Sequence, residues 1–506
     1  MRVRFFLLLS GSLMVSVPDA FSAETKGTAQ KPPTPVKHTK AVEKDVAFEK
    51  ALMEAYRHNP EWKSAIAHKE MVNESLAQAV SRWQPTVTAR YSLSGGKADS
   101  DRTYPDEVTD PTSRSKLTNR TTTDNRTRED NISATVGMNL FDGLATTNGI
   151  SAAEHNVAAA RLELVASEQQ FLQRVIEAYL SVWETRQRLV IAKKMENNLT
   201  SDLRAAQRKF EVGTGTRIEV AAAEAQRADA VYRRTSAQAA LEAAIARFEA
   251  ATRTKPEEAF SLPPLPKGLP ESEEKFRRLA QMGNPGVHSA LEKARASHDS
   301  VSVERGGLLP RVDVEFSVAR SIGKQRDALK DNSTGGLPNF DTDSLSYRGG
   351  LSVSVPIIAS SSSGGNVYSA SRRASRAALE AEMAYQKGVF DLMAECVRIW
   401  NSFLAAKAQL EQSAAAVRSA EIAVDGVRLA AEHGMRSQTE VLYAEGKLLD
   451  SRNNAVEAQK NHVLMAYAML SLIGQLTAKG LGLNVARYDV EEGENAARYA
   501  LPFVLE

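Results

Sequence analysis

The sequence contains the same unit twice, and this internal duplication limits the possible folds more than any other feature. Short matches recur at a constant offset of 225 residues: Asn59-Pro60 with Asn284-Pro285, Ser64-Ala65 with Ser289-Ala290, and Pro85 with Pro310. Later matches have slightly smaller offsets, 217 for Trp183 and Trp400 and 221 for Glu219-Val220 and Glu440-Val441. A duplicated unit predicts a quasi-symmetric structure rather than an enzyme with one asymmetric pocket.

The first residues read as an export signal. Residues 1–23 combine Arg2 and Arg4 with a short apolar run and a small-residue cleavage site, which predicts a secretory signal peptide. Residues 24–45 are rich in Pro, Lys and Thr and are expected to form a flexible leader. No later stretch has 18 consecutive apolar residues, so the sequence excludes a helical membrane protein.

Period-2 alternation predicts four strands, two in each copy. We expect them at about 85–95, 131–141, 310–322 and 346–356, with apolar side chains such as Val87, Tyr91, Val314 and Phe316 on one face. The polar stretches between them, 96–130 and the one around 324–343, lack any period and are expected to be exposed loops.

Four strands with one apolar face are too few to close a barrel, which needs about eight or more. Either they pack on a helix or several chains contribute to one barrel. The other face carries Arg90, Arg311, Asp313 and Glu315, which suits a water-filled interior. That composition favours the second possibility, with the apolar face left for lipid.

Long helices separate the strand pairs. Residues 46–82 have helical spacing with a turn at Asn59-Pro60, and 150–212 contain neither Gly nor Pro. At 1.5 Å per residue the latter stretch spans roughly 95 Å, far more than a compact domain holds. Helical hairpins are therefore expected at about 149–255, turning at Gly213 and Gly215, and at about 366–475, turning at Gly434. The resulting organisation is a first repeat (46–260), a Pro-rich linker (261–271), a second repeat (272–477) and a tail (478–506).

These residues resemble the TolC-like family of outer-membrane efflux and secretion channels. The matching motifs are Asn59-Pro60-Glu61, Pro85 before a strand, Leu140-Phe141-Asp142-Gly143, and the stretch from Phe210 to Val220 around Gly213-Thr214-Gly215-Thr216. The tail, with Arg487-Tyr488-Asp489, is similar to that of type I secretion members.

The resemblance implies a mainly α fold with a transmembrane β part. Three chains would give four strands each to one twelve-stranded barrel in outer-membrane lipid, above a periplasmic tunnel of antiparallel coiled coils. It implies an exit duct in the outer membrane of a Gram-negative bacterium, reached through a periplasmic adaptor by an inner-membrane ABC or proton-driven transporter. The hairpin turns would contact the adaptor.

The resemblance also places a periplasmic gate at the hairpin turns. Arg436 and Glu440 match positions that constrict the tunnel, and Glu219 matches the partner acid in the first copy. Tyr443 stands at a position that is often acidic, so a second acidic ring is in doubt. The alternative for Glu219 and Glu440 is a solvated first-turn carboxylate stabilised by the helix dipole, and Arg217 fits a surface charge as well as the gate.

Other classes of protein are disfavoured. The 64 basic and 62 acidic residues nearly cancel, which does not indicate nucleic-acid binding. Eight scattered histidines and one cysteine, Cys396, give no metal-ligand spacing, and no catalytic motif or cofactor signature is present. The alternatives are a periplasmic adaptor or a structural coiled-coil envelope protein. An adaptor carries a single hairpin inserted in compact β modules, and a structural coiled coil needs no lipid-facing strands.

Overall fold

The computed structural model describes residues 46–105, 118–257, 260–329, 340–356 and 366–485. The expected signal peptide and leader, and the part of the expected tail after residue 485, lie outside the described residues. In chain order the elements are α1 (Val46–His58), α2 (Pro60–Ser81), β1 (Thr86–Pro105), β2 (Thr118–Phe141), α3 (Ala145–Glu211), α4 (Arg217–Thr252), α5 (Glu273–Gly283), α6 (Pro285–Gly306), β3 (Arg311–Leu329), β4 (Phe340–Ser354), α7 (Val367–Glu432) and α8 (Gln438–Leu472).

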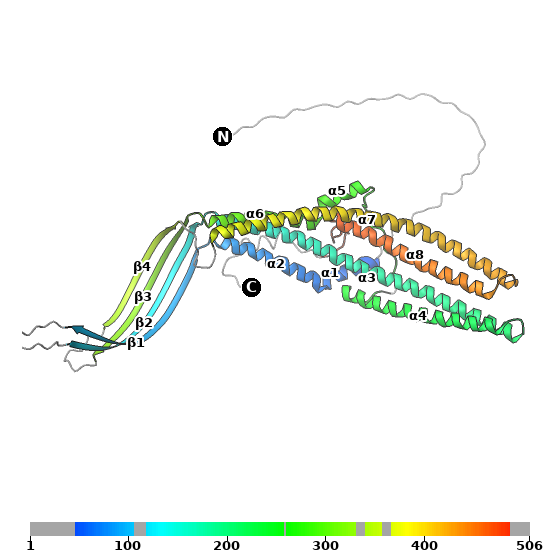
Figure 1. Ribbon diagram of the computed structural model, residues 1–506, viewed down its shortest axis with the longest axis horizontal. Coiled ribbons are helices and arrows are strands. Elements are labelled where there is room, and N and C mark those ends of the chain that lie inside the picture. The colour runs from blue at the N-terminus through cyan, green and yellow to red at the C-terminus, as the bar shows by residue number, and fades with distance from the viewer. Residues whose placement is uncertain (1–45, 106–117, 258–259, 330–339, 357–365, 486–506) are drawn as a thin grey trace, which may run out of the picture. The chain divides into compact units, whose positions relative to one another are not determined.

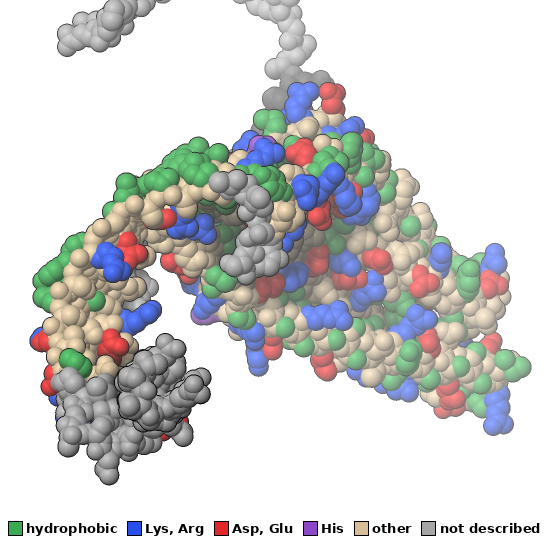
Figure 2. All heavy atoms as spheres, turned by 60° about the vertical axis from the view of Figure 1, so that its left-hand side comes forward, with side chains coloured by type: hydrophobic (Ala, Val, Ile, Leu, Met, Phe, Trp, Pro, Cys, Tyr) green, Lys and Arg blue, Asp and Glu red, His purple; other side chains and the backbone are tan. Residues whose placement is uncertain are grey.

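The strands form one antiparallel sheet in the order β1-β2-β3-β4 (Figure 1). The two hairpins of the duplicated halves are joined at its centre, where Val136 of β2 lies opposite Phe316 of β3 and Met138 lies opposite Val314. Because directly opposed residues share a face, the register gathers the apolar positions of all four strands on one side. Figure 2 shows these hydrophobic side chains along one surface of the sheet.

The strands are longer than the sequence predicted. The expected loop over 96–130 is wrong for the described residues, because β1 and β2 stay paired from Gly96 and Thr127 out to Pro105 and Thr118. The loop expected around 324–343 likewise contains the end of β3 and the start of β4. The physical reason is that the ladder is held by backbone hydrogen bonds. Where both faces meet water, no apolar alternation marks the strand.

The helices form two long antiparallel hairpins, α3 with α4 and α7 with α8, and α2 and α6 pack beside α3. Helix α3 has 67 residues and begins at Ala145, before Gly149, rather than after it. Its start is held by the Asp142 carboxylate, which accepts a hydrogen bond of 2.8 Å from the Thr146 amide. None of the described helices combines the length and apolar character needed to cross a bilayer.

One large hydrophobic core lies where the hairpins meet α1 and α5. Tyr179 is fully buried at its centre, stacks on Phe260 at 4.1 Å, and donates a hydrogen bond to the Ser261 carbonyl. Trp183 is buried and Trp400 packs against the same core, as expected for packing residues. Burial also raises the pKa of the Cys396 thiol to about 11, so this cysteine packs as a small apolar group. The core therefore fixes the two copies against each other midway along the helices.

Candidate functional site

The first hairpin turn, between α3 and α4, is built around glycine. Gly213 has φ +78, a left-handed conformation that ends the helix, and the amides of Thr214 and Gly215 donate to the Lys209 carbonyl at 2.9 Å. A Cβ on Gly215 would lie 3.0 Å from the Phe210 amide nitrogen, so only glycine fits there. These contacts fold the chain back within a few residues, as the sequence predicted.

Glu219 is held locally at the start of α4. Its amide donates to the Thr216 hydroxyl at 3.2 Å, and its carboxylate accepts from the Thr216 amide at 3.0 Å. This reciprocal pair is a capping box, which satisfies amides that the first helical turn leaves without partners. The Glu219 carboxylate thus has a structural partner within its own turn.

The second turn repeats the geometry with one substitution. Gly434 has φ +73 and ends α7, and Ser437 caps α8 by accepting from the Glu440 amide at 3.3 Å. At the offset of 221, Arg436 occupies the place of Gly215 (215 + 221 = 436). Its guanidinium donates to the Glu440 carboxylate at 3.0 Å. Glu440 therefore pairs with arginine instead of closing a capping box.

The predicted gate residues lie at the same end of the helices but do not all meet within one chain (Figure 1). Arg436 contacts Glu440 and not Glu219, and both side chains of that pair are about half-exposed. Arg217 is exposed, and Tyr443 is 79% exposed. The turns thus present charged and aromatic groups that a neighbouring molecule can reach.

Large apolar side chains also lie open at the turns. Val212, Ile218 and Met435 are 73%, 81% and 71% exposed, respectively, and Phe210 is about half-exposed. Exposed apolar groups concentrated at one end of a molecule mark an interaction surface. The turns are therefore suited to contact another protein.

A buried charge cluster, missed by the sequence analysis, lies behind the turns. It consists of Asp202 on α3, Arg428 on α7 and Glu445 on α8. Glu445 is only 3% exposed, and its Oε1 accepts a hydrogen bond from the Arg428 guanidinium. Glu445 Oε2 and Asp202 Oδ2 are buried and have no hydrogen-bond partner among the described residues. Two carboxyl groups thus share one guanidinium.

Both carboxyl groups of this cluster are easier to protonate than usual. Burial raises the pKa of Glu445, the Asp202 charge raises it further, and Arg428 opposes both effects. Burial likewise raises the pKa of Asp202, against the opposing effect of Arg428. The cluster borders a pocket of about 270 Å³ that also contains Glu421, Asp425 and Arg452. Because it joins α3 to both helices of the second hairpin, its charge state affects how the hairpins pack.

One sequence signal could have identified part of this cluster. Arg428 and Glu445 are nearly equidistant from the Gly434 turn, so an antiparallel hairpin brings them together. The first copy has Gln207 and Glu224 at the corresponding places (428 − 221 and 445 − 221), so the ion pair is not duplicated. Asp202 carried no comparable signal, because its position depends on packing between the copies.

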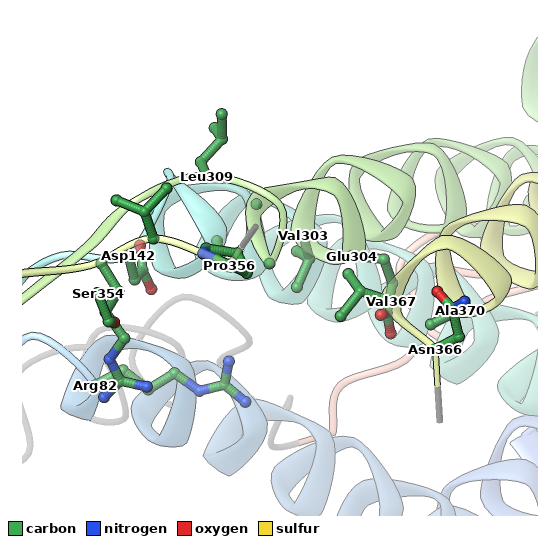
Figure 3. Close-up of a pocket in the computed structure, with 15 residues that line it drawn as sticks. Arg82, Asp142, Val303, Glu304, Leu309, Ser354, Pro356, Asn366, Val367 and Ala370 are labelled. Atoms are coloured by element: carbon green, nitrogen blue, oxygen red, sulfur yellow. The ribbon is translucent and has the colours of Figure 1, made fainter. Parts of the chain in front are cut away.

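A second cavity lies at the junction between sheet and helices (Figure 3). It has a volume of about 710 Å³, with Asp142 and Ser354 at the strand ends and Glu304 of α6 at the helix side. Arg82, just beyond α2, adds a basic group. The junction thus continues the polar face of the sheet toward the helices. Among the described residues, no group of three or more His, Cys, Asp or Glu side chains is arranged to hold a metal ion.

Comparison with known proteins identifies the family. The profile of the family described as outer membrane efflux protein matches residues 51–252 and 277–475, one match for each half of the duplication. The outer membrane efflux protein BepC of Brucella suis is 28% identical over 454 residues, covering 88% of this chain and 90% of BepC. The alkaline protease secretion protein AprF of Pseudomonas aeruginosa is 25% identical over 468 residues, covering 89% of this chain and 90% of AprF.

Solved structures show the same fold. The outer membrane channel CmeC of Campylobacter jejuni superposes with a TM-score of 0.67 at 16% identity, over 90% of each chain. The long helical hairpins, the four-stranded sheet and the twice-matching profile agree with one another. The chain belongs to the outer membrane efflux protein family and is an outer-membrane channel protein with its helices in the periplasm.

Proposed function

We propose that three copies of this chain form an exit duct that is closed at its periplasmic end by charges at the helix turns. The observation that supports assembly is the sheet, whose outer strands β1 and β4 have no partner on their free edges within the described chain. In lipid an unpaired strand edge is costly, because no water satisfies its backbone groups. Pairing β4 of one copy with β1 of the next removes every edge.

The number of copies follows from the space that the duct requires. Two copies would give eight strands, and barrels of about eight strands are filled by their own side chains. Three copies give twelve strands and leave an aqueous passage, which agrees with the family resemblance. The polar face would line this passage with Arg90, Arg348, Arg311 and Glu315, whereas Val87, Tyr91, Val314 and Phe316 would face lipid.

At the periplasmic end, we infer that Arg436 and Glu219 of adjacent hairpins attract each other in the closed trimer. A partly exposed pair contributes about 1 kcal/mol or less, so the closed state remains easy to open. Each residue must leave its local partner to form the pair, Arg436 from Glu440 and Glu219 from the Thr216 cap. Three Glu440 carboxylates around a narrow opening would favour cations.

Planar bilayer recordings test the gate. Arg436→Ser and Glu219→Ala should raise single-channel conductance, whereas Glu440→Ala should mainly lower cation selectivity. Arg233→Ser is the matched control, because Arg233 pairs with Asp229 on the exposed surface of α4 away from the turn. Unchanged conductance in the Arg436→Ser/Glu219→Ala double variant, with normal trimers, would reduce these residues to solvated helix-end charges.

The transporter served by the duct is the finer part of the proposal. We favour type I protein secretion with an ABC exporter and a periplasmic adaptor, because AprF is named for protease secretion and aligns over nearly its whole length. A proton-driven efflux pump is the second candidate, supported by the name of BepC. Deleting the gene separates the two: loss of a secreted protein from the medium supports the first, and increased drug sensitivity with an unchanged secretome supports the second.

A further inference from the structure

A row of basic residues crosses the apolar face of the sheet beyond the end of its apolar band. Lys97 of β1 lies directly opposite Arg126 of β2, which lies directly opposite Arg326 of β3. In the row below, Arg128 lies opposite Lys324. All five side chains are exposed. The strand register thus places five cations as cross-strand neighbours on three adjacent strands.

This basic group continues the apolar face of the sheet. Leu93 and Ile322 are the last apolar side chains of that face on β1 and β3, and Lys97 and Arg326 stand four residues farther along. At about 3.4 Å per residue and a strand tilt of about 40°, the two basic rows lie roughly 5 and 10 Å above the last apolar row. That height corresponds to the headgroup layer of a bilayer whose hydrocarbon region covers the apolar band.

The cations are not neutralised within the chain. Like charges directly opposite one another destabilise a sheet. Asp99 and Asp124 lie 3.7 and 3.5 Å from Lys97, Asp124 lies 3.7 Å from Arg126, and Asp130 lies 3.8 Å from Arg128, all longer than a hydrogen bond.

On β3, no carboxylate of the described chain lies within 4.0 Å of Lys324 or Arg326. Asp341 faces Lys324 across the strands but does not reach it. The arrangement leaves positive charge in excess and guanidinium groups free to bind an anion.

We propose that Lys97, Arg126, Arg128, Lys324 and Arg326 form a basic belt that binds phosphorylated headgroups of glycolipids in the outer leaflet. The proposal rests on the sheet spanning the outer membrane with its apolar face toward lipid. A phosphate offers oxygens that arginine contacts in a bidentate way. A lipid satisfies both parts of this surface, with acyl chains against the apolar band and phosphate at its edge. A soluble anion would satisfy only the belt.

Lipid retention by the purified trimer tests the belt. The trimer is incorporated into nanodiscs of phosphatidylcholine doped with either bisphosphorylated or monophosphorylated lipid A, and bound lipid is counted by native mass spectrometry. We expect the bisphosphorylated form to be retained at least about tenfold more than the monophosphorylated form, with a preference that falls as salt rises. Lys97→Gln/Arg126→Gln/Arg326→Gln should remove this preference.

The matched control is Arg90→Gln/Arg348→Gln, which removes two cations from the polar face of the same sheet and should leave retention unchanged. If the triple variant does not fold, Arg126→Gln and Arg326→Gln are measured singly and should each weaken retention. Equal retention of both lipids overturns the belt, as does binding of inorganic phosphate alone with the same variant sensitivity. Bilayer conductance of the same trimers is the separate readout: conducting trimers without lipid preference refute only the belt, whereas wild-type trimers that do not insert refute the channel.

Discussion

Replacing Arg428 by Met tests the buried cluster behind the turns. The change removes the guanidinium and leaves Glu445, only 3% exposed, beside Asp202 without a cation. Breaking a buried pair in this way costs about 3 to 5 kcal/mol. Because 42% of the Arg428 side chain is exposed, we expect the lower end, about 3 kcal/mol per chain at pH 7.5. With an unfolding entropy of about 2 cal/mol/K per residue, this loss lowers the midpoint by roughly 3 °C.

The pH dependence of this loss has a definite sign. The packed state raises the pKa of Glu445 and Asp202, so it binds their protons more tightly than the opened state does. Packing therefore gains stability as pH falls through the raised pKa and loses it above that pKa. Without Arg428 the carboxyl groups can escape the penalty by protonation, so the defect should be smaller at pH 5 than at pH 7.5.

Circular dichroism at 222 nm, recorded at one fixed scan rate in detergent, follows the unfolding of the helices. Arg436→Met is the matched control, because it removes an exposed arginine from the neighbouring turn and should shift the midpoint by less than about 1 °C. An Arg428→Met defect of equal size at pH 5 and pH 7.5 would refute the reasoning. A defect no larger than that of the control would do the same.

Three further predictions concern the same cluster, the sheet and the second turn. Glu445→Gln removes one of the two carboxylates that share Arg428, so the unfolding midpoint should change less between pH 5 and pH 7.5 than in the wild type; an unchanged pH slope would contradict the cluster. Single cysteines at Val87 and Thr88 lie on opposite faces of β1, and a water-soluble thiol reagent should label only the Thr88 site in membranes; equal labelling would contradict the face assignment. Gly434→Ala forces a side chain into φ +73 and should destabilise the protein by about 1 to 2 kcal/mol. Gly446→Ala, inside α8 with open space around its Cβ position, should stabilise it by about 0.5 to 1 kcal/mol, and thermal midpoints of the same sign would refute this pair.

The sequence predicted those features that depend on local pattern. The duplication located both turns, because Gly213 and Gly434 are needed for a left-handed residue at each helix end. Alternation located the apolar face, because the side-chain period of a strand is two residues and half of the sheet faces a different medium. Those signals lie in consecutive residues and require no knowledge of the neighbouring elements.

Features that depend on contacts between distant segments were not predicted. The outer halves of β1 and β2 were read as a loop, because their stability comes from a partner strand rather than from their own side chains. Asp202 was not singled out, because its importance comes from Arg428 and Glu445 of the other copy. The predicted pair of Glu219 and Arg436 is absent within one chain, and its formation between chains stays a prediction.

The pairing of β2 with β3 has a consequence for how the assembly can come apart. This seam joins the last strand of the first repeat to the first strand of the second, which is the relation that β4 would have to β1 of the next copy. The wall of the proposed trimer would then contain six seams between repeats, of which three lie within a chain and three between chains. Only the latter can dissociate without breaking the peptide backbone. Folding of each chain would therefore complete half of these seams before any subunit meets another, and assembly would have to close only the other half.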